Sequence, residues 1–107
     1  MLKEEELIRV ITCEPKKVPQ EVFISKKIQT IVDFLGGYFE VSGIDKSLIL
    51  YCRERFTGLQ YNRLVGERPI YGNFIISKIK SDGKRSSLTH EDLMQMKCIQ
   101  PIAVSNW

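Results

Sequence analysis

The stretch DFLGGYFEVSGIDKSLILYCRERFTGLQYNR, residues Asp33–Arg63, decides the fold. It predicts the end of a helix, a stop at Gly36, where glycine takes the left-handed conformation without steric cost, then two strands and a polar loop. Residues 38–44 alternate apolar and polar side chains, which is typical of a strand with one buried face. Residues 47–53 form an unbroken apolar run, which is typical of a central strand. We expect these two strands to pair as a hairpin.

The residues before this stretch predict a second hairpin and the start of the helix. Residues 7–13 (LIRVITC) are β-branched and almost continuously apolar, which indicates a strand covered on both faces. Residues 20–24 (QEVFI) predict a short antiparallel partner. Ser25 is the expected N-cap, since its hydroxyl can accept from the first-turn amides. An apolar stripe at helical spacing follows and predicts a helix that faces a sheet: Ile28, Ile31, Val32 and Leu35.

The residues after this stretch predict one more long strand and a closing helix. Residues 59–64 could form one helical turn, and 70–80 read as a single strand with a bulge at Gly72. The Asp82–Gly83 pair predicts a tight turn. The closing helix is expected to run to about Lys97, with Thr89 as its N-cap and Asp92 at the third position of a near capping box. Leu93 and Met96 are expected to face inward.

Together these elements predict an α+β fold. It consists of a mostly antiparallel sheet of two or more hairpins, with a helix after the second strand and a short C-terminal helix. At 107 residues, the chain is expected to be a single domain over 1–107, with a core at about 7–97 and a tail at 98–107. The tail is apolar enough to pack on the domain or to form a dimer contact.

Composition argues against several classes of function. The net charge of +3 permits acidic partners without requiring them. Three widely spaced cysteines and one histidine provide no metal-ligand set, and no phosphate-binding glycine motif is present, so we expect no metal and no cofactor. The lone His90 is expected to be a solvated first-turn residue, so we predict no catalytic residue and no enzyme.

The sequence also predicts a cytoplasmic protein with no membrane contact. No apolar run approaches the roughly 20 residues that span a bilayer, and the acidic start does not resemble a signal peptide. We expect the cysteines to be reduced structural thiols.

Two clusters are candidates for binding. Tyr61, Asn62 and Arg63 combine a stacking face, an amide and an anion-binding fork, which suits a nucleotide or another small anion. The alternative is structural, with the amide holding a turn and the guanidinium pairing with an acid. The second cluster is a basic hairpin that suits a nucleic-acid groove or, alternatively, a solvated edge: Lys78, Lys80, Lys84 and Arg85.

Several segments together resemble a family of uncharacterised proteins, domain of unknown function 3846. The segments are Glu14–Pro15, LGGYFEV at 35–41, LILYC at 48–52, Gly58–Leu59 with Asn62–Arg63, Ile70–Gly72 with Phe74–Ile75, and Ser87–Thr89 with Glu91. The resemblance implies a small protein of a phage or other mobile element and directs attention to Asn62 and Arg63. It implies no activity.

Three hypotheses of function follow. The first is a non-enzymatic binding or accessory factor, such as a counter-defence factor, that acts through contacts with a protein partner. The second is a nucleic-acid-binding module that uses the basic hairpin at 78–85. The third is a small-molecule or nucleotide binder at the loop at 58–63.

Overall fold

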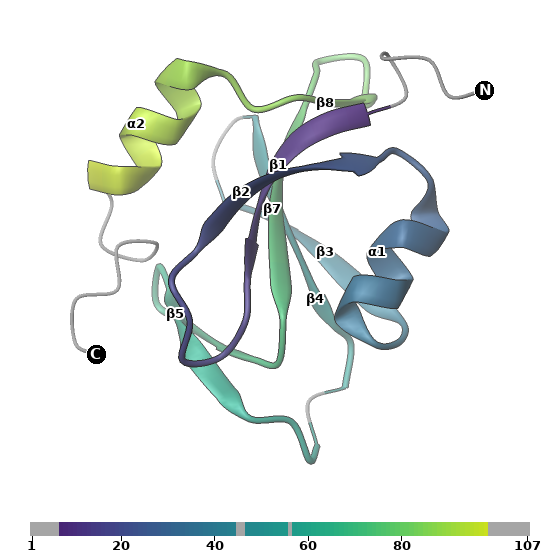
Figure 1. Cartoon of the computed structure of the whole chain (residues 1–107), viewed down its shortest axis with the longest axis vertical. Coiled ribbons are helices and arrows are strands. Elements are labelled where there is room, and N and C mark those ends of the chain that lie inside the picture. Colours follow the sequence, from purple (N-terminus) through teal and green to yellow (C-terminus); the bar gives the residue numbers. More distant parts are fainter. Residues whose placement is uncertain (1–6, 45–46, 56, 99–107) are drawn as a thin grey trace.

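The computed structural model describes residues 7–44, 47–55 and 57–98 and shows an antiparallel sheet at the centre of the chain (Figure 1). The strand order is β2-β1-β7-β4-β3, and short β8 pairs with the end of β7. The bounds are β1 Leu7–Cys13, β2 Gln20–Ser25, β3 Phe39–Gly43, β4 Leu48–Arg53, β7 Phe74–Ile79 and β8 Arg85–Ser86. The two expected hairpins, β1–β2 and β3–β4, are confirmed.

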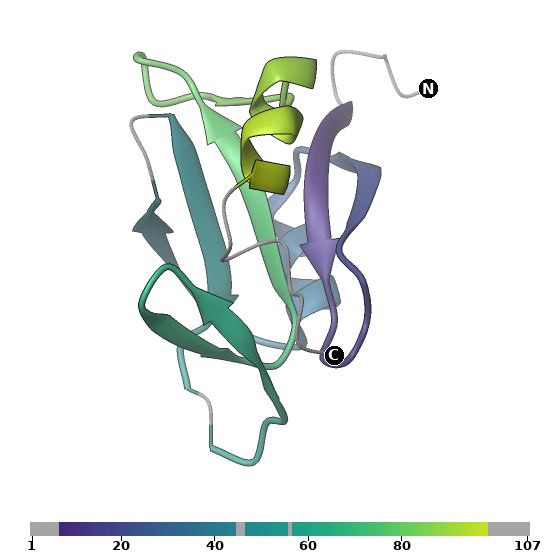
Figure 2. The same ribbon diagram turned by 90° about the vertical axis from the view of Figure 1, so that its left-hand side faces the viewer.

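Other elements pack on both faces of the sheet, as Figure 2 shows, with α1 (Ile28–Leu35) behind it. In front lie α2 (His90–Cys98) and a separate hairpin of β5 (Tyr61–Val65) and β6 (Arg68–Tyr71). Alternate side chains of the central strands enter the two cores. The core on the α1 side includes Ile8, Val10, Ile31, Leu35, Ile49, Tyr51 and Ile75. The core on the opposite side includes Ile11, Cys13, Leu50, Val65, Ile70, Phe74, Ile76, Leu88 and Leu93. The α+β prediction is confirmed.

Helix α1 begins later than the sequence predicts. Ser25 is the last residue of β2, where it pairs with Leu7, so it cannot also be the N-cap. Lys27 takes that position without a side-chain bond, and the Ser25 hydroxyl accepts from the Lys27 amide at 3.1 Å. The C-terminal stop is as expected, since Gly36 has φ of 87°. The following Gly37 leaves room for the Arg53 side chain, whose Cζ lies 2.9 Å from where a Cβ would be.

Two expectations for the C-terminal half are wrong. Residues 59–64 form no helical turn, because residues 61–65 form strand β5. Residues 70–80 are two strands, β6 and β7, because Gly72 has φ of 78° and the chain turns there. Asn73 holds the turn by donating to the Phe34 carbonyl at 2.9 Å.

The closing helix is confirmed, with its cap. The Asp92 amide donates to the Thr89 hydroxyl at 3.1 Å, and the Thr89 amide donates to the Asp92 carboxylate at 2.8 Å. Leu93 is buried, as expected. The Met96 side chain and the tail from residue 99 lie outside the described residues, so the expected inward position of Met96 and tail contact stay predictions.

The completely buried Phe74 of β7 offers a test of this architecture. Phe74→Ala should lower the free energy of unfolding by about 3–5 kcal/mol, because it opens a cavity between the sheet and its front layer. Phe23→Ala is the matched control, since this side chain is 61% exposed and should cost less than about 1 kcal/mol. Urea unfolding of both variants measures the difference. Equal losses would contradict the assignment of β7 to the centre of the core.

Candidate functional site

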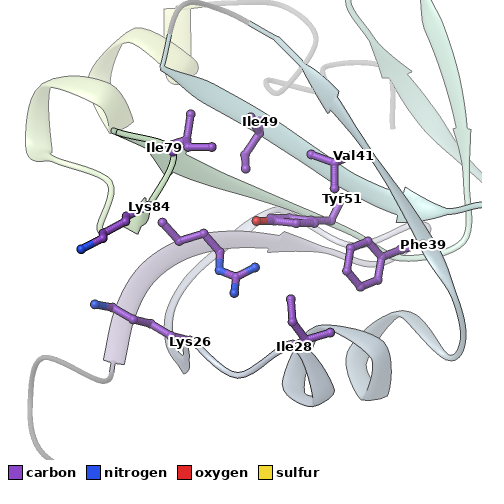
Figure 3. A pocket seen from close by; sticks show the side chains of 10 residues that line it. Lys26, Ile28, Phe39, Val41, Ile49, Tyr51, Ile79 and Lys84 are labelled. Atoms are coloured by element: carbon purple, nitrogen blue, oxygen red, sulfur yellow. The ribbon is translucent and has the colours of Figure 1, made fainter. Parts of the chain in front are cut away.

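An open groove lies on the α1 side of the sheet, and Figure 3 shows the side chains that line it. Its volume is about 520 Å³. The floor comes from β3, β4 and β7, and the walls come from the start of α1 and the turn between β7 and β8. The lining residues are Lys26, Ile28, Phe39, Val41, Ile49, Tyr51, Ile79, Gly83, Lys84 and Arg85.

The groove exists because one short helix cannot cover this face. A helix is about 10 Å wide, whereas five strands spaced by about 4.8 Å make a sheet roughly 20 Å across. Helix α1 has eight residues and buries only Ile31 and Leu35. The part of the face over β3 and the ends of β4 and β7 therefore stays open. Ile28 and Val41 are 47% and 52% exposed there.

The floor of the groove is apolar and aromatic. The rings of Phe39 and Tyr51 meet edge to face, with centroids 5.3 Å apart and an angle of 81° between their planes. Tyr51 is 2% exposed, and Figure 3 shows its hydroxyl pointing into the groove. The floor can therefore hold apolar side chains and offers one hydroxyl.

The rim of the groove is positively charged. Lys26, Lys84 and Arg85 line it, and no acidic residue is among its lining residues. The two lysines are exposed, and Arg85 is half-buried. Among the described residues, none of the three has a salt bridge. Figure 3 shows Lys26 and Lys84 at the same end of the groove. This arrangement favours an occupant with apolar groups and a negative charge.

The structure divides the basic hairpin of the sequence analysis. Lys78 extends toward α2, where its Nζ lies 2.9 Å from Asp92 Oδ2, on the side of the sheet away from the groove. Lys84 and Arg85 line the groove, and Lys80 is exposed without lining it. The four cations therefore do not share one surface. A nucleic-acid contact by the hairpin stays a prediction.

The predicted ligand-binding trio is also divided. The side chains of Asn62 and Arg63 are buried, whereas Tyr61 is 48% exposed and meets the ring of Tyr71 edge to face. The Asn62 amide donates to the carbonyl oxygens of Cys13 at 3.3 Å and Gly72 at 2.7 Å. These bonds connect β5 to the end of β1 and to the turn before β7.

Arg63 belongs to the same buried network. Its Nε donates to Asn62 Oδ1 at 2.8 Å, and its guanidinium also donates to the Lys17 carbonyl. Burial lowers the pKa of Arg63, and the nearby Cys13 and Tyr61 partly offset this decrease. Burial raises the pKa of the Cys13 thiol to about 11, although Arg63 acts in the other direction. These contacts support a structural role for Asn62 and Arg63, with an amide oxygen and a main-chain carbonyl as partners of the guanidinium. The expected pairing of Arg63 with an acid and ligand binding by the trio both stay predictions.

The structure also places the histidine and two of the cysteines. His90 is exposed at the first position of α2. In the described ranges, no three His, Cys, Asp or Glu side chains gather where they could hold a metal ion. No helix in the described part of the chain is long and apolar enough to cross a membrane. Cys13 and Cys52 are free and buried.

Sequence reasoning missed the groove. The alternation at 38–44 placed Phe39 and Val41 on one face, but a sequence pattern does not show which part of that face α1 leaves uncovered. Lys26 and Lys84 are 58 positions apart in number, and only the fold brings them to one rim. The one signal in the sequence that could have indicated the groove was the position of Lys26 and Lys84 beside apolar strands.

The network around Asn62 predicts a large cost for its removal. Asn62→Leu should lower the free energy of unfolding by about 2–3 kcal/mol, because the carbonyls of Cys13 and Gly72 lose a donor inside the protein. The control is Leu64→Ala on the same strand, where the side chain is 49% exposed and the cost should stay below about 1 kcal/mol. Thermal and urea unfolding measure both. An unchanged stability of Asn62→Leu would argue against the structural role.

Asp92 predicts a pH dependence of stability. Burial raises its pKa, but hydrogen bonds from Thr89 and Lys78 outweigh burial, so the pKa in the folded protein is lowered. The stabilisation is therefore present above the unfolded pKa of about 3.9 and is lost as the pH falls through the lower folded value. Asp92→Asn should cost about 1 kcal/mol at pH 7, and the difference should shrink below about pH 4. Urea unfolding across this range measures it; a constant difference would contradict the assignment.

Comparison with known proteins gives one match. No curated protein and no solved structure matches the chain significantly. The sequence model of the family described as "Domain of unknown function (DUF3846)" matches residues 8–100, which is most of the chain. This confirms the resemblance inferred from the sequence. The chain belongs to the DUF3846 family.

Proposed function

We propose that the protein is a non-enzymatic binding factor whose groove receives an acidic and apolar segment of a protein partner. The observation that carries the proposal is the combination of an apolar floor with three rim cations and no lining acid. Electrostatic complementarity of this kind steers partners and selects among them.

The shape of the groove favours a protein segment over a small ligand. Small-molecule sites usually enclose most of the ligand surface. This groove is open, and Ile28 and Val41 on its borders are about half exposed. Exposed apolar groups that surround a concave surface are typical of protein contacts. A segment that alternates acidic and apolar residues would place its apolar groups on the floor and its carboxylates near the rim.

The proposal extends the first hypothesis from the sequence and replaces its unspecified contact surface with a defined one. The remaining parts of that hypothesis are included: an accessory role, such as counter-defence, in a phage or mobile element, in the cytoplasm. The resemblance noted in the sequence supports only the origin in a phage or mobile element, and the free, buried thiols of Cys13 and Cys52 support the cytoplasm. The accessory role rests on the groove alone.

A labelled synthetic peptide in which glutamate alternates with leucine and phenylalanine tests the proposal. Fluorescence anisotropy should show binding, and replacing glutamate by lysine in the peptide should abolish it. Lys26→Glu with Lys84→Glu should weaken binding by about tenfold or more, since two rim attractions become repulsions. NMR of the complex should show shifts at the methyl groups of Ile28, Val41 and Ile79.

The matched control reverses two exposed lysines outside the groove, Lys16→Glu with Lys80→Glu, which gives the same change in net charge. It should change the affinity by less than about threefold, because neither side chain lines the groove and exposed charges outside a contact contribute little. An equal loss of peptide affinity in both double variants would show that only the net charge of the protein matters, and it would overturn the proposal. Tighter binding of single-stranded DNA than of the peptide, lost only in the groove variant, would assign the groove to nucleic acid instead.

A further inference from the structure

The open edge of the sheet at β3 has a regular pattern of outward backbone groups. Ile44 donates to the Leu48 carbonyl at 2.9 Å, and Glu54 donates to the Tyr38 carbonyl at 3.2 Å. In an antiparallel ladder, bonded and non-bonded pairs alternate. In the register of β3 with β4, Glu40 and Ser42 therefore bond to β4. The amides and carbonyls at 39, 41 and 43 point away from the sheet.

These outward groups have no partner in the described part of the chain. Strand β3 is the last strand of the sheet order and pairs only with β4, and Figure 2 shows it as the outermost strand. Among the described residues, no hydrogen bond reaches the backbone amides or carbonyls of 39, 41 or 43. Tyr38 and Val41 are 83% and 52% exposed. The edge is thus available to another strand.

β3 has little of the usual protection of an edge strand. Natural edges carry charged side chains, above all lysine, or proline or a bulge, or are very short. β3 contains no lysine or proline, its one charged residue, Glu40, pairs with Arg68 of the same chain, and its ladder with β4 is regular. The opposite edge differs: β2 lies between Pro19 and Lys26, and Arg9 covers its Phe23, with the guanidinium carbon 5.3 Å from the ring centroid.

We propose that β3 pairs with β3 of a second copy of this chain, antiparallel and centred on Val41, to form a symmetric dimer with one continuous sheet. In this register Val41 lies opposite Val41 of the second copy, and Phe39 lies opposite Gly43. The space beside Gly43 is free, since an added Cβ would meet no atom within 4 Å. The aromatic ring of one copy can therefore lie over the glycine of the other.

Charge also permits this pairing. Glu40 is the one charged residue of β3, and its carboxylate already pairs with Arg68 of the same chain. In the proposed register Glu40 lies directly opposite Ser42 of the second copy, and Glu40 of the second copy is its diagonal neighbour on the same face. Because Arg68 pairs with Glu40 in each chain, these two carboxylates are each already neutralised. The symmetry axis is perpendicular to the sheet, so the grooves of the two copies lie on the same face. The dimer does not depend on what the groove binds.

Sedimentation and light scattering of the full chain, without any peptide, test the dimer. The wild-type protein should dimerise between about 10 µM and 1 mM, the range of small, transient interfaces. Val41→Lys and Val41→Glu should each raise the dimer dissociation constant by about tenfold or more, because like charges then face each other. An equal mixture of the two variants should restore dimerisation, which a folding defect would not do.

The matched control is Val18→Lys, which places the same charge at a valine that is 72% exposed but lies outside any strand. It should leave the dimer unchanged. Hydrogen exchange of the backbone amides gives a second readout. The exchange rates of the amides of 39, 41 and 43 should fall as the protein concentration rises, while the rates of Glu40 and Ser42 stay constant. A wild-type protein that stays monomeric at all concentrations would overturn the proposal. Dimers that persist in both Val41 variants would also overturn it, because they would show that the interface lies elsewhere.

Discussion

The fold depends on one strand, β7, which is bonded on both edges and buried on both faces. It pairs with β1 through Ile11 and Ile76 and with β4 through Leu50 and the same Ile76. Phe74, Ile75, Ile76 and Ser77 are each at most 1% exposed. Such a strand is stable only where a layer packs on each face of the sheet, because its apolar side chains project from both faces. Helix α1 provides one layer, and the β5–β6 hairpin and α2 provide the other.

The front layer is held by polar contacts as well as by apolar packing. Asn62 and Arg63 bond to main-chain carbonyls of Cys13, Lys17 and Gly72, while Arg68 reaches Glu40. Buried polar groups of this kind are favourable only when they are hydrogen-bonded. They specify where the hairpin sits, since a shifted hairpin would leave these groups without partners. The same residues looked like a ligand site from the sequence.

The back layer is incomplete, and that incompleteness gives the protein its candidate surfaces. An eight-residue helix covers the middle of the face and leaves the groove over β3 and β4. The open edge of β3 borders that groove, with Val41 belonging to both. A protein partner at the groove and a second copy at the edge would therefore be neighbours. Both surfaces are compatible with a binding role that requires no catalytic group.

The sequence by itself determined the local structure of this protein: the hairpins β1–β2 and β3–β4, the stop of α1 at Gly36, and the cap of α2 at Thr89. Each of these depends on neighbouring residues, through alternation, a left-handed glycine or a capping bond. It did not determine the start of α1, because the pairing of Ser25 with Leu7 extends β2 to that point. It did not determine the break at Gly72 either, because the Phe34 carbonyl that holds this turn is distant in the sequence. Only the tertiary structure turned Asn62 and Arg63 inward, separated Lys78 from Lys84, and left the groove uncovered. The physical reason is that burial and proximity depend on which layers meet across the sheet, which no local pattern records.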